Sequence, residues 1–306
     1  MMQLSMRSFS LIAFLSLIIN FQSKIAQANE NLFAEISQCG DALYASDGYS
    51  YVSSGNTFII KSQSASESIQ KVKLQSPIVD ILSVEIAGRP SLFTLTPDAL
   101  ELRNQQTGEL EKSFSVPNEF DSRSTSSFPV MSGMVSLGST IYVAAGAAGV
   151  LVFDLNQQTF QGSLQLPQLN DDPLKISGYI DVTAKGDDLI FLVDSISGSA
   201  DPRALGSNRG LVTYNVRSQK SHLYSYVIDP GFETIDTIGD KLLITSFLPA
   251  WTFSLNSLLE NHRPSLIRRW VSLGNLSLQK SGKIFFDAKS GMVYSCLKSK
   301  IVSMKW

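Results

Sequence analysis

The sequence has 306 residues, with 25 Lys and Arg against 27 Asp and Glu, and a formal net charge of −2. It lacks the clustered basic excess of nucleic-acid-binding domains, so we expect no nucleic-acid partner. With two cysteines outside CxxC spacing and two histidines, a Cys/His metal centre is a poor interpretation.

The N-terminus has the order of a secretory signal peptide. Arg7 precedes an apolar run at 9–19, and small residues end at Ala28. That run is shorter than the roughly 20 residues that cross a bilayer, and no later stretch approaches this length. We therefore expect residues 1–28 to be a leader and residues 29–306 a single exported domain, secreted or periplasmic, without a membrane span.

A repeating unit is clearest at residues 137–164. A glycine turn at Gly138 leads to a strand at 141–144, a small-residue turn, a strand at 150–153, a polar turn at 156–159 and a last strand ending at 164. The apolar residues alternate with a period of two and are β-branched or aromatic, which predicts strands. The run 144–149 is followed by a strand and not by a helix, so we interpret it as a hairpin turn and not as a phosphate-binding loop.

The same unit recurs along the chain. Its marker glycines stand at positions 48, 88, 138, 186, 239 and 282. A further short strand precedes most of them, at 81–84, 134–137, 180–183, 235–238 and 276–278. Units of four strands at this spacing predict an all-β fold, a β-propeller of six blades with four antiparallel strands each, with five or seven blades as alternatives. A pair of β-sandwich domains is the competing interpretation.

Ring closure would bring Cys39, at the start of the first blade, beside Cys296 in the last blade. In an exported chain an even cysteine count favours a disulfide, which would join the two ends of the ring. Two buried free thiols are the alternative.

Residues 141–144 together with 149–154 resemble the "YVA…G-L-x-V-x-D" core of LVIVD-repeat propellers, and more loosely surface-layer and YncE-like propellers. The resemblance implies an exported propeller that serves as a binding platform. The other units depart from the pattern, since Tyr214-Asn215 and Ser254-Leu255 replace the Phe-Asp pair.

The central channel is the first candidate site. Five residues before the marker glycines stand small or polar residues, namely Ser83, Gly133, Asp181, Thr234 and Ser277. Such residues suit crowded positions about an axis, and Asp181 would alternatively make the channel hydrated or cation-binding. Asp80, Glu85 and Asp236 are the other acidic residues of the inner strands.

A long insert at 194–210 is the second candidate site, because long loops on a rigid scaffold commonly carry function. It would lie on the same propeller face as the acidic linker containing Asp171 and Asp172. Four of its charged residues are candidates for binding an anion or a partner: Asp194, Asp201, Arg203 and Arg209. Its oxygen-rich start could hold Ca²⁺, although it lacks EF-hand spacing, and a solvated loop is the simplest alternative.

These observations predict a monomeric, non-enzymatic binding or assembly scaffold without a cofactor. Its partner would be another exported or envelope protein, or a small ligand in the channel. Enzyme motifs are scarce, with no Gly-x-Ser-x-Gly elbow and no histidine in triad spacing. The alternative function is a lactonase-like hydrolase that uses a divalent metal held by acidic residues of the channel.

Overall fold

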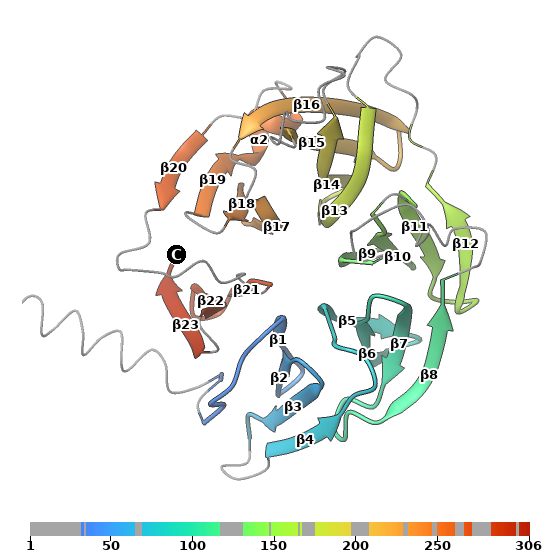
Figure 1. Ribbon diagram of the computed structural model, residues 1–306, viewed down its shortest axis with the longest axis vertical. Coiled ribbons are helices and arrows are strands. Elements are labelled where there is room, and N and C mark those ends of the chain that lie inside the picture. The colour runs from blue at the N-terminus through green and yellow to red at the C-terminus, as the bar shows by residue number, and fades with distance from the viewer. Residues whose placement is uncertain are drawn as a thin grey trace, which may run out of the picture.

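The computed structural model describes residues 32–33, 35–64, 69–116, 131–146, 148–164, 166, 175–196, 208–228, 232–246, 250–260, 266–270, 283–297 and 300–306. Six antiparallel sheets stand around a central axis like the blades of a propeller (Figure 1). The all-β, six-bladed prediction is confirmed. The described part of the chain has no helix with the length and hydropathy needed to cross a membrane.

The first three blades follow the predicted repeat. Blade 1 contains β1 (Ala42–Ser46), β2 (Tyr49–Ser54), β3 (Thr57–Ser62) and β4 (Ile69–Lys73). Blade 2 contains β5 (Asp80–Ile86), β6 (Arg89–Leu95), β7 (Ala99–Arg103) and β8 (Leu110–Ser115). Blade 3 contains β9 (Gly133–Leu137), β10 (Thr140–Ala144), β11 (Val150–Asp154) and β12 (Thr159–Ser163).

The second half of the ring is less uniform. Blade 4 contains β13 (Lys175–Lys185), β14 (Asp188–Ile196), β15 (Asn208–Asn215) and β16 (Lys220–Ile228). Blade 5 contains β17 (Phe232–Ile238), β18 (Lys241–Ser246), β19 (Ala250–Ser254) and β20 (Leu266–Trp270), with helix α2 (Leu255–Leu259) after β19. Blade 6 contains β21 (Phe285–Asp287), β22 (Met292–Leu297) and β23 (Lys300–Lys305).

Blade 6 differs from the sequence prediction, which placed its inner strand at 276–278, before the marker glycine at 282, and its second strand after that glycine. Of the strands described in this blade, β21 lies nearest the axis and β23 lies outermost (Figure 1). The hairpin glycine between the first two described strands is Gly291, with φ +66°. The expected inner strand at 276–278 lies outside the described residues.

The core lies between the blades. Each pair of neighbouring blades buries its own apolar cluster, because a single four-stranded sheet cannot cover both of its faces. Between blades 2 and 3, for example, Phe93 and Phe153 pack edge to face with ring centroids 6.0 Å apart. Burial of such clusters is the main stabilising contribution to the ring.

The disulfide between Cys39 and Cys296 is present, with the two Cα atoms 5.5 Å apart, which confirms that prediction. Cys39 precedes β1 and Cys296 lies in β22, so the bond joins blades 1 and 6 across 257 positions. Both cysteines are buried in the apolar cluster of that seam, beside Phe33 and Tyr294.

The glycine and alanine run between β10 and β11 is a turn between two strands, as expected. Ala145 N–H donates to the Gly149 carbonyl oxygen at 2.9 Å. Gly146 also pairs with Tyr179 of blade 4, each N–H donating to the other carbonyl oxygen at 3.0 Å. The turn therefore joins blade 3 to blade 4.

Candidate functional site

The channel contains a buried lysine between two aspartates. Lys283 stands two residues before β21, and its Nζ lies 3.1 Å from Asp80 Oδ2 and bonds Asp181 Oδ1. The Asp181 side chain is 1 % exposed and that of Lys283 is 13 % exposed, so the ion pairs are largely withdrawn from water. The lysine thus supplies the cation for both carboxylates.

Each aspartate also binds the backbone of the next blade. Asp80 at the start of β5 accepts from the N–H of Ile81 at 2.9 Å and from Met134 of blade 3 at 2.8 Å. Asp181 repeats this pattern, accepting from Val182 at 2.8 Å and, through Oδ2, from Ile235 of blade 5 at 2.9 Å. The two carboxylates therefore connect blade 2 to blade 3 and blade 4 to blade 5.

Gly133 of blade 3 is required for this packing. A Cβ atom at position 133 would stand 2.9 Å from Lys283 Nζ and 2.9 Å from Asp181 Cγ, and closer still to Asp181 Oδ1. Real Cβ atoms do not approach other atoms so closely. The absence of a side chain at Gly133 leaves the space in which the lysine meets the carboxylate.

Asp236 lies close to the cluster but has different partners. Its Oδ1 accepts from Thr237 N–H at 2.7 Å and from Thr183 Oγ1 at 3.4 Å. Burial raises the pKa of Asp236 to about 7, although the Thr237 hydrogen bond and the charge of Lys283 oppose the rise. At neutral pH this carboxyl is therefore only partly ionised.

The charges within the cluster are strongly coupled. Burial raises the pKa of Asp181 above its ordinary value, with Lys283 opposing. Burial alone would lower the pKa of Lys283, but the charges of Asp181 and Asp80 outweigh that effect and raise it. The lysine is consequently a permanent cation, because its neutral form would leave the carboxylates without a counter-charge.

The other channel candidates do not join this cluster. Glu85 is exposed on β5. Ser83 donates to Asp47 Oδ2 at 3.1 Å, and Thr234 bonds Thr245 within blade 5. Ser277 lies outside the described residues. Within the described ranges, no group of three His, Cys, Asp or Glu residues is arranged to hold a metal ion.

Sequence reasoning missed Lys283, although the pattern contained a signal. Asp80, Asp181 and Lys283 each stand directly before an apolar β-branched residue, namely Ile81, Val182 and Ile284. These are equivalent positions on three blades. Because one of them holds a lysine and two hold aspartates, the pattern predicts that the lysine contacts the aspartates across the axis.

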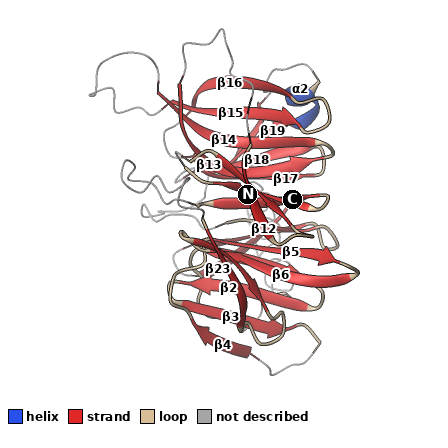
Figure 2. Ribbon diagram, turned by 90° about the vertical axis from the view of Figure 1, so that its right-hand side faces the viewer, coloured by secondary structure: helices blue, strands red, loops and turns tan. Residues whose placement is uncertain are grey.

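Both ends of the predicted insert at 194–210 are strand, in β14 and β15 of an elongated blade 4, and residues 197–207 between them lie outside the described residues. Strands β13 to β16, at the top of Figure 2, have 11, 9, 8 and 9 residues, whereas each strand of blade 3 has five. The pairing of β14 with β15 continues to Ser195 and Asn208. Asp194 and Arg209 stand opposite each other in the register. The remaining predicted residues of this face, Asp171, Asp172, Asp201 and Arg203, lie outside the described residues.

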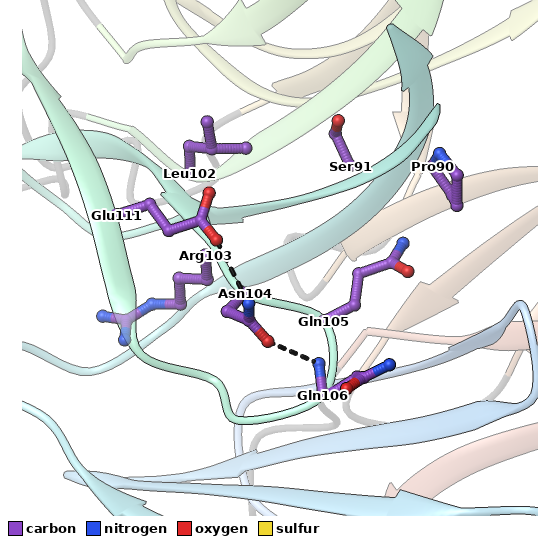
Figure 3. Close-up of a pocket in the computed structure, with 8 residues that line it drawn as sticks. All are labelled: Pro90, Ser91, Leu102, Arg103, Asn104, Gln105, Gln106 and Glu111. Atoms are coloured by element: carbon purple, nitrogen blue, oxygen red, sulfur yellow. Dashed lines mark hydrogen bonds between the residues drawn. The ribbon is translucent and has the colours of Figure 1, made fainter. Parts of the chain in front are cut away.

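A surface pocket of about 340 Å³ lies on blade 2 (Figure 3). It is lined by Pro90, Ser91, Leu102, Arg103, Asn104, Gln105, Gln106 and Glu111. The Arg103 guanidinium donates to Thr94 Oγ1, Glu101 and the Gly108 carbonyl oxygen, and it lies 5.9 Å from the centroid of the Phe58 ring of blade 1. The guanidinium is thus bound within blade 2 and contacts blade 1 through the Phe58 ring.

Comparison with solved structures identifies the fold alone. The WD40 repeats of RRP9 superpose with a TM-score of 0.56 at 7% identity, over 88% of this chain and 94% of that one. PorZ, a surface component of the type-IX secretion system of Porphyromonas gingivalis, gives a TM-score of 0.52 at 12% identity over 88% of this chain, which spans only 33% of PorZ. BamB from Moraxella catarrhalis gives 0.47 at 10% identity, over 87% and 81% of the two chains.

No family model matches the sequence, and no curated protein matches it either. The specific resemblance to LVIVD-repeat and YncE-like propellers is therefore not confirmed by a family match. The structure is a six-bladed β-propeller, and what it shares with these neighbours is the propeller fold.

Proposed function

We infer that the protein is an exported, non-enzymatic scaffold that binds a partner through the face carrying the blade 4 insert. A propeller fold supports a binding or scaffold role in general terms, because loops on a closed ring are held in fixed relative positions. The partner is a protein or another ligand of the same compartment.

The elongated blade 4 carries this proposal. Its β14–β15 hairpin continues in register to Ser195 and Asn208 and connects directly to the insert at 197–207. The extension is braced by the paired backbone hydrogen bonds between Gly146 and Tyr179. An ordered hairpin on a braced blade fixes the two points from which the insert starts and ends, and fixed attachment points favour binding because less freedom remains to be lost.

The channel supports a face-binding role as well. Near the axis, Asp80, Asp181 and Lys283 bind each other and the backbones of the neighbouring blades. For the hydrolase alternative, a metal would have to compete with the Lys283 ammonium for both carboxylates. A partner that binds the insert face would meet no such competition.

Export is part of the proposal. The leader pattern ending at Ala28 predicts it, and the Cys39–Cys296 disulfide is consistent with an oxidising compartment. The likeness of residues 141–154 to LVIVD-type repeats points in the same direction. Sequencing of the mature N-terminus tests this step, and we expect it to begin at Asn29.

Shortening the insert tests the binding role. Residues 199–206 are replaced by two glycines, which leaves the Ser195–Asn208 register pair in place, so the thermal midpoint should stay within a few degrees of the parent. We expect a partner captured by the intact protein from envelope extract to be lost with the shortened one. Arg217→Ala, in the exposed turn at the opposite end of the same blade, is the matched control and should retain it. Full recovery of the partner with the shortened protein would contradict binding through the insert face.

A further inference from the structure

Blade 6 has a small apolar attachment to blade 5. Among the described residues, their shared cluster has three buried members, Ile238, Leu243 and Val293, whereas thirteen form the cluster between blades 2 and 3. Apolar burial stabilises each seam roughly in proportion to its area. The described seam with blade 5, to which Lys241 adds a contact 5.3 Å from the Trp306 ring centroid, is therefore smaller than the seam with blade 1, whose cluster has nine buried members. Covalent and polar attachments add to these two apolar seams.

The disulfide is the first of these attachments. It joins blade 6 to blade 1 through Cys296 and Cys39. Close to it, the N–H of Lys283 donates to the Asp41 carbonyl oxygen at 3.1 Å, between the same two blades. Both contacts lie on one side of blade 6.

Lys283 also reaches the far side of the axis. Its ammonium bonds Asp80 of blade 2 and Asp181 of blade 4, and these carboxylates accept from Met134 of blade 3 and Ile235 of blade 5. One side chain of blade 6 is thus connected to four other blades without passing through the seam with blade 1. Its removal would leave two buried carboxylates without a cation, which is strongly destabilising.

We propose that Lys283 is a second closure of the propeller ring, which acts at the axis and keeps blade 6 docked when the disulfide is absent. The two closures act on different sides of the blade. Breaking either one leaves the other to hold β21 to β23, and breaking both leaves the blade held by its apolar seams alone.

Hydrogen exchange of the mature protein tests the proposal, with the outer strands β11 and β12 of blade 3, away from the Lys283 cluster, as the internal reference. In the wild type reduced with a phosphine, the amides of β22 and β23 should keep their protection relative to blade 3. In oxidised Lys283→Met they should also stay protected. In reduced Lys283→Met we expect their exchange to rise by roughly a hundredfold relative to blade 3.

Two results would overturn the proposal. The first is loss of β22 and β23 protection in the reduced wild type, because Lys283 would then not hold the blade alone. The second is unchanged protection in reduced Lys283→Met. If that variant does not fold, the Lys283→Met/Asp80→Asn/Asp181→Asn protein, in which all three groups of the cluster are uncharged, replaces it under the same criteria. Arg217→Met, which breaks an exposed ion pair with Asp187, is the matched control and should behave as the wild type.

Discussion

Replacing Gly133 by alanine should disrupt the centre of the ring. The added Cβ would stand 2.9 Å from Asp181 Cγ and 2.9 Å from Lys283 Nζ. Asp181 cannot turn aside without loss, because Oδ1 accepts from Val182 N–H at 2.8 Å and Oδ2 from Ile235 N–H at 2.9 Å. The lysine or the carboxylate must move, and separating a buried pair costs about 3 to 5 kcal/mol.

The assay is urea unfolding of the oxidised protein, followed by near- and far-ultraviolet circular dichroism. Coincidence of the two transitions is checked first, since a free energy of unfolding requires two-state behaviour. Gly178→Ala is the matched control, because its Cβ would lie 3.4 Å from the Gly146 backbone, an ordinary contact. We expect the control to change the free energy of unfolding by about 1 kcal/mol or less.

A double variant separates the clash from other effects of the substitution. With Asp181→Ala in place, Gly133→Ala should cost little more, because the carboxylate that it would strike is gone and only the flexible end of the Lys283 side chain remains 2.9 Å away. Equal stability of the two single glycine variants would refute the reasoning, as would additive losses in the double variant.

Three further predictions follow from the same structure. The native protein should bind a proton at Asp236 up to a pH of about 7, whereas the unfolded chain releases it near its ordinary pKa of 3.8. The contribution of Asp236 to stability should therefore be fully present below pH 4 and be lost as pH rises through 7, by at most about 4 kcal/mol, and Asp236→Asn should remove this part of the pH dependence in urea titrations. Arg103→Met should lower the free energy of unfolding by about 3 kcal/mol, because it removes the cation of a buried charged network. The exposed Arg217→Met should lower it by about 1 kcal/mol or less. Equal losses would contradict a stabilising role for the Arg103 network. A thiol assay on the unfolded, unreduced protein should detect no sulfhydryl from Cys39 or Cys296, and two free thiols would contradict ring closure by a disulfide.

The repeat could be predicted from the sequence because its hairpins are short and contain glycine. Gly138, Gly186 and Gly239 are each the first residue of a two-residue turn between the inner two strands, with φ of 60° to 63°. A left-handed backbone of this kind favours glycine, so spacing between such glycines reports the spacing of blades.

Counting back five residues from the marker glycine did not find the equivalent position in blade 2, for a geometric reason. Its hairpin is longer by two residue pairs than that of blade 3, and Gly88 is the second residue of the turn. Counting back five residues therefore gave Ser83, whereas the structural equivalent of Gly133 and Asp181 is Asp80. Strand length is set by packing against the neighbouring blades, which local sequence does not report.

Lys283 could not be placed because Gly282 was taken as the hairpin glycine of blade 6. Gly291 has that role, which puts Lys283 at the channel end of the inner strand. Lysine side chains are usually exposed, and a buried lysine requires carboxylates to pair with it. Here the two carboxylates come from two distant blades. Such pairing across a ring is a tertiary property.

Site-specific cross-linking in the native host tests the central claim most directly. A photo-reactive residue replaces Ser199 in the insert or, in the matched protein, the exposed Ser218 in the β15–β16 turn at the other end of blade 4. We predict a discrete cross-linked partner from position 199 and none from position 218. No adduct from position 199, or the same adduct from both positions, would contradict binding through the insert face.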